Sequence, residues 1–255
     1  VENADKVFVT TSSSDNTLTV TGAFAEDSEL DADAVITSKD DIVFNGVGVL
    51  NINSSEDGID GKDDIKFTGG TLNISCQDDA IEANDSFAAA DGKLTINAAD
   101  DGIHAENEDD NTKGSVYFCG GTYDITAGDN AVHGETIVQI DGGTFTITGA
   151  EGLEGTWVQV NDGDITINAS DDGINAANKS SAYTTAAEIN GGTITITRGA
   201  GDTDAADSNG NLIITGGTIN ITAQSPFDID GQISFTGGTV TANGQQLTTI
   251  ANAMM

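Results

Sequence analysis

The chain has 255 residues, of which 42 are Asp or Glu and only 8 are Lys or Arg, so its formal net charge is −34. Because contacts to a nucleic-acid backbone require clustered Lys and Arg, this composition excludes nucleic acid as a partner. Apolar residues still make up 37% of the chain and Gly contributes 32 residues, as in folded globular proteins. We therefore expect a folded polyanion whose partners are cations, or anionic ligands bridged by cations.

The chain is expected to form one domain. It has a single Pro and no Pro-rich or Ser-rich linker. We divide it into an N-terminal capping segment (1–33), repeat coils (34–243) and a C-terminal tail (244–255). No apolar run approaches the roughly 20 residues of a membrane span. No leader peptide opens the sequence, which predicts a cytosolic or a processed protein, and the composition favours the second. The two cysteines, Cys76 and Cys119, fall at different points of the repeat, which argues against a disulfide.

A motif of Gly followed by alternating apolar residues recurs along the chain. Its copies are "GVLNINS" at 48, "GGTLNIS" at 69, "GKLTINA" at 92, "GGTYDIT" at 120, "GGTFTIT" at 142, "GDITINA" at 163, "GGTITIT" at 191, "GGTINIT" at 216 and "GGTVTAN" at 237. Gly70 and Gly92 are 22 residues apart, and longer spacings mark inserted loops. The alternation indicates strands with one inward face, so Leu72 and Ile74 are predicted to stack on Leu94 and Ile96.

Two further apolar columns recur between these copies. One is a second strand in each turn with apolar residues at alternate positions, such as Ile65 and Phe67. The other is a single apolar residue in a short strand, at Ile59, Ile81, Ile103, Val132, Leu153, Ile174 and Ile229. Each turn of such a chain buries its face only by stacking on its neighbours. Three inward columns per turn predict an all-β fold, a single-stranded right-handed parallel β-helix of about nine to ten coils with three strands per coil.

Paired acids recur just before the short third column, as in "SEDGIDG", "QDDAIEA" and "ADDGIHA". Stacked parallel strands lie about 4.8 Å apart, so Asp57, Asp79 and Asp101 are predicted to form a ladder of like charges. Each neighbour contact then costs about 3 to 4 kcal/mol at an effective dielectric constant of 20. Calcium binds carboxylate oxygens at about 2.3 to 2.6 Å, so an ion midway between two rungs is at its preferred distance from both. Asp-Gly turns explain one Asp per coil, but they do not require a doubled acid.

The sequence therefore predicts several bound calcium ions. The predicted ligands are the acids of the turns and their neighbours on successive coils: Glu56, Asp57, Asp60, Asp78, Asp79, Glu82, Asp100, Asp101, Asp129, Asp171 and Asp172. For Glu151, Glu154 and Asp204 we favour turn or solvated positions. His104 and His133 lie on adjacent coils without nearby thiols, which favours solvated polar positions over a zinc site.

Several stretches resemble a known family. They are "DDGIHAENEDDNTKGSVYF", "KDDI" at 39 and 62, and "DDGINAAN" followed by "GGTITIT". They resemble secreted bacterial carbohydrate-binding parallel β-helix domains, formerly classed as a domain of unknown function, over about 34 to 243. The resemblance implies a secreted or cell-surface protein that binds calcium and acidic polysaccharide such as polygalacturonate.

The Asp-Asp-Gly-x-Asp turn is also similar to the calcium site of one group of β-helical pectate lyases. Glu56, Asp57 and Asp60 match this turn except that Glu takes the first place. Asp78, Asp79 and Glu82 match it with Ala80 in place of Gly. The later coils depart from it: the acid is replaced by His104, by Asn175 and, in the copy aligned on Ile229, by Phe227. The resemblance therefore implies calcium less strongly toward the C-terminus.

Three functions are compatible with these features. The first is a noncatalytic module whose calcium ions bridge an acidic polysaccharide to the protein. The second is a calcium-dependent lyase, in which Lys62, Lys66, Lys93 or Lys113 would act as the base. The third is a structural adhesin or a binder of ice or a crystalline glycan, which would use the outward threonines of the Gly-initiated strands, although outward Thr is common on any β face.

We favour the noncatalytic module, because the acidic turn recurs with graded changes as an extended binding surface would. The surrounding carboxylates should also raise the pKa of any nearby Lys and make it a poor base. Lys62, Lys66, His104 and Trp157 are predicted to contact the polysaccharide. Trp157 precedes the inward Val158 and should point outward, to stack on a sugar or to pack under the insertion near 176–187. The sequence does not indicate an oligomeric state.

Overall fold

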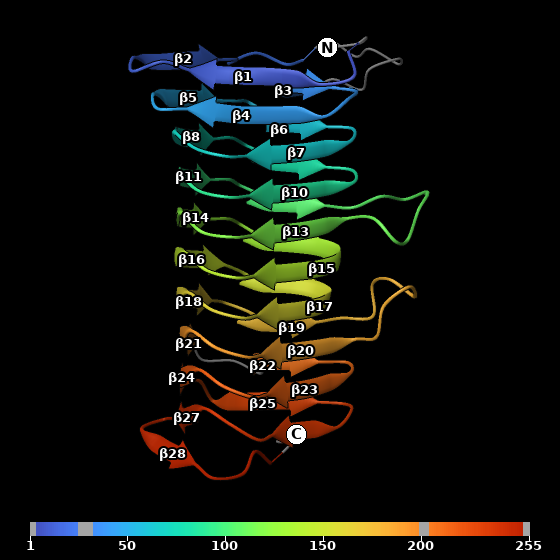
Figure 1. Cartoon of the computed structure of the whole chain (residues 1–255), viewed down its shortest axis with the longest axis vertical. Helices are drawn as coiled ribbons and strands as arrows, with labels where there is room; N and C mark the ends of the chain where they lie inside the picture. The colour runs from blue at the N-terminus through green and yellow to red at the C-terminus, as the bar shows by residue number, and fades with distance from the viewer. Residues whose placement is uncertain (1–3, 25–32, 199–203, 252–255) are drawn as a thin grey trace.

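The computed structural model describes residues 4–24, 33–198 and 204–251 as an elongated stack of coils (Figure 1). Every regular element in these residues is a β-strand, apart from turns and bends. None of them belongs to a helix long and apolar enough to cross a membrane. Neighbouring coils pair in parallel, which confirms the predicted all-β parallel β-helix. Its right-handedness stays a prediction.

Each coil contributes to three faces. The first face contains β3 (Ala34–Ser38), β6 (Asp57–Gly61), β9 (Ile81–Ala83), β12 (Ile103–Ala105), the first parts of β15 (Val132–Ile140) and β17 (Leu153–Val160), β19 (Ile174–Ala176), β22 (Asp204–Ser208) and β25 (Ser225–Ile229). The second face contains β1 (Val7–Thr11), β4 (Ile42–Gly46), β7 (Asp64–Phe67), β10 (Ser86–Ala89), β13 (Ser115–Phe118), the later parts of β15 and β17, β20 (Ala186–Ile189), β23 (Asn211–Ile214) and β26 (Ile233–Phe235).

The third face contains the Gly-initiated strands. They are β2 (Asp15–Thr19), β5 (Val49–Asn53), β8 (Thr71–Ser75), β11 (Lys93–Asn97), β14 (Thr122–Thr126), β16 (Thr144–Gly149), β18 (Asp164–Ala169), β21 (Thr193–Arg198), β24 (Thr218–Thr222) and β27 (Thr239–Ala242). The last strand, β28 (Gln245–Leu247), turns back and pairs antiparallel with β27. The first and second faces together form a sheet of 17 strands, and the third face with β28 forms a sheet of 11.

The inward columns of the third face are as predicted. Leu72 pairs with Leu94 and Ile74 with Ile96, and the same register continues along the stack. An aromatic group fills the middle of the core, where Phe118 contacts Phe87, Tyr123 and Phe145 with ring centroids 5.8, 4.7 and 5.1 Å away. Alternation of apolar residues thus places one continuous core along the helix axis.

The stacking begins before residue 34. In the segment that we expected to cap the helix, β1 pairs in parallel with β4, and β2 pairs in parallel with β5. At the other end, β28 lies within the expected tail. Residues 1–3, 25–32 and 252–255 of these two segments lie outside the described residues. Cys76 is buried and Cys119 is exposed, and both are free thiols.

One predicted register is wrong. We aligned the last copy of the first face on Ile229, which placed Phe227 where other coils have an acid. In the structure Ile174 pairs with Ala206 and Ala206 with Phe227, so Phe227 occupies the inward column and is buried. The position that corresponds to the acid is therefore Ser225, which pairs with Asp204.

Candidate functional site

Two columns of polar side chains run along the first face. The inner acid column lies two residues before each inward apolar residue and contains Asp57, Asp79, Asp101 and Asp172. The outer ladder lies directly after that residue. It contains Asp60, Glu82, His104, His133, Glu154, Asn175, Asp207 and Asp228, each paired in register with the next. The parallel stacking thus converts a sequence repeat into two continuous rows.

The inner acid column has a structural role. Oδ1 of Asp57 accepts a hydrogen bond from the backbone N–H of Asp79 at 2.9 Å, and Oδ1 of Asp79 accepts one from Asp101 at 2.8 Å. Asp101 repeats this with the N–H of Asn130 at 2.7 Å. One oxygen of each carboxylate therefore joins two coils, and the second oxygen is left for other ligands.

Several carboxylates of these columns have raised pKa values. Burial, followed by the charges of Asp33 and Asp79, raises the pKa of Asp57 to about 8. Burial is also the main reason why the pKa of Asp172 rises to about 6 and that of Asp207 to about 7. Loss of water and nearby like charge both disfavour an ionised carboxylate, and a bound cation reverses both effects.

Five groups of three side chains in the described residues have potential metal-ligating atoms within 4.8 Å of one another. They are Asp78, Asp79 and Asp100; Asp100, Asp101 and Asp129; Asp63, Asp64 and Asp85; Asp204, Asp207 and Asp228; and Asp101, His104 and His133. The first two groups consist of predicted calcium ligands. They share Asp100 and form one continuous carboxylate cluster, which we call the acidic-turn cluster.

The other predicted calcium ligands belong to none of these five groups. They are Glu56, Asp57, Asp60, Glu82, Asp171 and Asp172. Of these, Asp60 is fully buried and pairs with Lys62, whose Nζ lies 2.9 Å from its Oδ2. The six residues line the same two columns or flank them, so their role as ligands stays a prediction.

Sequence reasoning missed two of the acidic groups. Asp207 and Asp228 were hidden by the register error, because only the pairing of Ala206 with Phe227 makes them neighbours. The 21-residue interval between those two positions, close to the base repeat, was the available signal. Asp64 begins β7 and Asp85 directly precedes β10, beyond the first face; the acids of the "KDDI" stretch at 62, Asp63 and Asp64, were used only for the family resemblance and not as a source of ligands.

One acid and one histidine were misjudged as solvated. Glu154 is only 4% exposed, and its carboxylate accepts from Asn130 at 3.0 Å and pairs with Lys179 at 3.0 Å. Glu151 does lie at a bend, where burial and the nearby Glu154 raise its pKa to about 8. His133 is only 6% exposed. Glu154 and His133 are buried because residues from neighbouring coils surround them, which a pattern read within one coil does not show.

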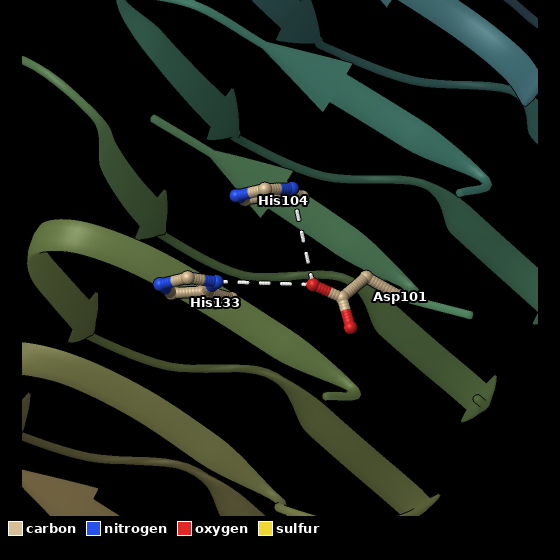
Figure 2. A group of neighbouring side chains, drawn as sticks. All are labelled: Asp101, His104 and His133. Carbon is tan, nitrogen blue, oxygen red and sulfur yellow. Dashed lines mark ion pairs between the residues drawn. The ribbon is translucent and has the colours of Figure 1, made fainter. Parts of the chain in front are cut away.

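The two histidines form a stacked pair beside Asp101 (Figure 2). Their rings are 4.6 Å apart and inclined by 9°. Figure 2 shows one oxygen of Asp101 facing both rings, and Oδ2 lies 3.9 Å from Nδ1 of His104 and 3.8 Å from Nδ1 of His133. His104 Nδ1 also makes a 3.2 Å hydrogen bond to Oδ2 of Asp79.

A polar groove of about 440 Å³ borders the outer ladder. It is lined by Lys62, Glu82, Asn84, His104, Glu106, Asn107, Glu108 and Asp109. Two of the four predicted carbohydrate contacts, Lys62 and His104, lie in this groove. Lys66 instead pairs with Asp64 at 2.8 Å on the second face, and Trp157 is half-buried with its Nε1 enclosed. The structure therefore does not bring the four residues together.

Two loops extend from the same side of the stack, between β12 and β13 and between β19 and β20 (Figure 1). They are hydrogen-bonded to each other. Asn111 Nδ2 donates to Ser181 Oγ at 2.9 Å, Ser180 Oγ donates to the carbonyl of Asn111, and Tyr183 donates to the carbonyl of Thr112. We call this contact the loop clasp. Its first loop supplies part of the groove, and Lys179 of the second loop reaches Glu154 of the outer ladder.

Comparison with known proteins identifies the class. A family profile described as "carbohydrate-binding domain-containing protein" matches residues 1–156 and 149–252. The chain therefore belongs to this family of carbohydrate-binding domains, and its predicted polysaccharide partner is supported at that level. Among solved structures, the polysaccharide lyase-like protein from C. thermocellum (gadolinium derivative) is 22% identical, with 82% of this chain and 84% of that chain covered and a TM-score of 0.38. No curated protein matches the chain.

Proposed function

We propose that this domain is a noncatalytic module, secreted or displayed at the cell surface, that binds an acidic polysaccharide such as polygalacturonate through calcium ions. The observation that carries the proposal is the acidic-turn cluster of Asp78, Asp79, Asp100, Asp101 and Asp129, which lies on the coils that also form the polar groove. A polyanion of charge −34 repels a polyuronate, and divalent cations held by the protein reverse that repulsion locally.

The donor set of this cluster fits calcium. Every atom that it offers is a carboxylate oxygen, and calcium binds six to eight oxygens in flexible geometry. Asp78 and Asp100 are exposed, whereas Asp101 is only 7% exposed. An ion held here would keep part of its coordination shell open to solvent, where uronate oxygens can replace water. The chain's own contribution is to hold the carboxylates in register across three coils.

The lysines support binding over cleavage. A lyase base must be able to release its proton near the working pH. Burial lowers the pKa of Lys62, but its hydrogen bond and charge interaction with Asp60 outweigh this and raise it. The hydrogen bond to Asp64 raises the pKa of Lys66. These two of the four candidate bases are therefore held in the charged form.

The proposal predicts calcium-dependent retention on polygalacturonate. We expect the domain to bind in millimolar calcium and to elute in chelator, without forming the ultraviolet absorbance of a 4,5-unsaturated uronate. Calcium at about 100 times its dissociation constant should also stabilise the fold by about 2.7 kcal/mol. The measurements are affinity electrophoresis, thermal melting and absorbance after long incubation.

Charge-matched variants test where the calcium is bound. Asp78→Asn with Asp100→Asn should abolish both the retention and most of the calcium-dependent rise in melting temperature. Asp124→Asn with Asp164→Asn removes the same charge from exposed positions on the third face and should change neither. Equal loss in both double variants would refute the acidic-turn cluster as the site. Unsaturated products that disappear in Lys62→Ala would instead show a lyase.

A further inference from the structure

We propose that Asp101, His104 and His133 form a second kind of metal site, specific for a zinc-class divalent ion, which shares Asp101 with the acidic-turn cluster but differs from it in its two imidazole ligands. The chain contains only two histidines, and parallel pairing of β12 with β15 places them directly side by side. Imidazole nitrogen is a preferred ligand of zinc, copper and nickel, whereas calcium takes oxygen ligands. The outer ladder therefore changes its metal preference at these two coils.

The distances fit a shared ion. Zinc binds nitrogen and oxygen ligands at about 2.0 to 2.2 Å, so two ligand atoms on one ion lie at most about 4.4 Å apart. Asp101 Oδ2 is 3.9 Å from His104 Nδ1 and 3.8 Å from His133 Nδ1, which is too long for hydrogen bonds and within this limit. Asp79 Oδ2, hydrogen-bonded to His104 Nδ1 at 3.2 Å, lies outside this group of three.

His133 provides independent support. Its side chain is only 8% exposed, and its Nε2 is buried without a hydrogen-bond partner among the described residues. The nearest carboxylates are Glu154, whose Oε2 is 3.7 Å away, and Glu135, whose Oε2 is 4.0 Å away. A buried imidazole with no hydrogen bond on Nε2 is costly. Metal binding through Nδ1 would fix the tautomer that carries a proton on Nε2, directed at these acids.

The outer side of each ring has the arrangement expected around a metal ligand. Nε2 of His104 lies 3.2 Å from Oε2 of Glu106, and Nε2 of His133 faces Glu154 and Glu135. Metal-bound histidines commonly donate their second N–H to a carboxylate, which orients the ring and strengthens the ligand. Each imidazole thus has one nitrogen toward Asp101 and the other toward an acid.

The test uses the untagged full chain in millimolar calcium. We expect one tightly bound Zn²⁺ per chain by calorimetry, and imidazole scattering in the zinc X-ray absorption spectrum, for which only these two histidines are available. His104→Gln and His133→Gln should each weaken zinc binding at least about 10-fold, and Glu106→Gln should weaken it about 10-fold through its partner. Because His104 is more exposed than His133, its variant remains informative even if His133→Gln does not fold.

Asp78→Asn separates this site from the calcium cluster. It should lower calcium uptake and leave zinc affinity unchanged. Zinc affinity that is unaffected by both histidine substitutions, or a zinc spectrum without imidazole, would overturn the proposal. Zinc that is displaced stoichiometrically by calcium would also overturn it, because the site would then be one of the carboxylate sites.

Discussion

The two carboxylate oxygens of Asp79 have different partners. Oδ1 accepts the backbone N–H of Asp101, and Oδ2 faces His104 on the solvent side. Asp57 likewise uses Oδ1 to hold the next coil. An Asn at such a position keeps the acceptor oxygen but loses the charge. Substitution by Asn therefore separates the structural role of the column from its role toward cations.

Asp57→Asn is expected to remove a pH dependence of stability. The pKa of Asp57 is raised from 3.8 to about 8 in the fold, so the folded state holds its proton more tightly than the unfolded state. The stabilisation by protonated Asp57 is complete below the unfolded pKa of about 4 and is lost as the pH rises toward 8. In chelator, unfolding free energies measured from pH 4 to 8 should fall less steeply for the variant than for the wild type.

Calcium should reverse which of the two proteins is the more stable at pH 8. In chelator the Asp57→Asn variant should be the more stable, because it has no buried charge at this position. With calcium bound nearby, the ionised Asp57 is favoured, and the wild type should be the more stable at pH 8. Asp91→Asn, at an exposed turn where Oδ1 accepts from the N–H of Gly92, is the control for a change of Asp to Asn outside the buried acid column. A variant whose pH profile in chelator coincides with that of the wild type would contradict the raised pKa.

At the scale of single strands, glycine fixes the entry to the third face. Gly92 has φ of +106°, in the region that favours glycine, and its backbone passes close to the coil before it. A Cβ there would lie 2.9 Å from the carbonyl oxygen of Gly70 and 2.8 Å from the ring of Phe67. The repeated Gly is therefore needed both for the turn and for close stacking of coils.

Gly92→Ala is expected to destabilise the domain more than an ordinary Gly→Ala change. The backbone conformation alone costs about 1 to 2 kcal/mol, and the contact with the Gly70 carbonyl adds to this. Gly22→Ala is the matched control, since no atom lies within 4 Å of its Cβ position. Denaturant unfolding in saturating calcium measures both. Equal effects would show that the turn relaxes freely.

The third face could be predicted from sequence because each of its strands carries the same two signals. Gly marks the turn, and alternating residues such as Leu94 and Ile96 mark the inward side, so the observed register followed directly. The first face has only one strong inward position per coil. The acidic turn is lost before Ala206 and in the next coil, "SPFDIDG". There the sequence alone makes Phe227 and Ile229 equally good candidates for the inward position, and only the pairing of Phe227 with Ala206 decides between them.

The candidate site was predictable only in part for a similar reason. The doubled acids at Asp78 and Asp79 repeat in sequence, and the structure does bring them together with Asp100. The histidine pair has no repeat of its own. The burial of His133 depends on Asp101 from the preceding coil and Glu154 from the following one, which are contacts between positions more than 20 residues apart.

At the scale of the whole molecule, charge opposes the compact state. The net charge is −34, and five of the seven lysines are already paired, as Lys6, Lys62, Lys66, Lys113 and Lys179 each contact an acid within 3.0 Å. Carboxylates on adjacent coils lie within one screening length at low salt, because that length is about 10 Å at 0.1 M and about 3 Å at 1 M.

The melting temperature in chelator is therefore expected to rise with salt. Between about 0.05 and 1 M sodium chloride the repulsion between coils is progressively screened. The calcium-saturated domain should show a smaller rise, since its acids are already neutralised. Scanning calorimetry at constant pH compares the two. A melting temperature that falls with salt in chelator would mean that attractive ion pairs outweigh the repulsion.

The loop clasp also has a mechanical consequence. Hydrogen bonds between coils run along the stack, so a force that pulls the two ends apart detaches coils one at a time rather than shearing many together. The clasp joins Asn111 and Thr112 to Ser180, Ser181 and Tyr183 across the coils between β13 and β19. These coils form one tethered segment that resists extension as a unit. The acidic-turn cluster lies at the edge of this segment, so tension transmitted through a bound polysaccharide would reach the coils that the loop clasp joins.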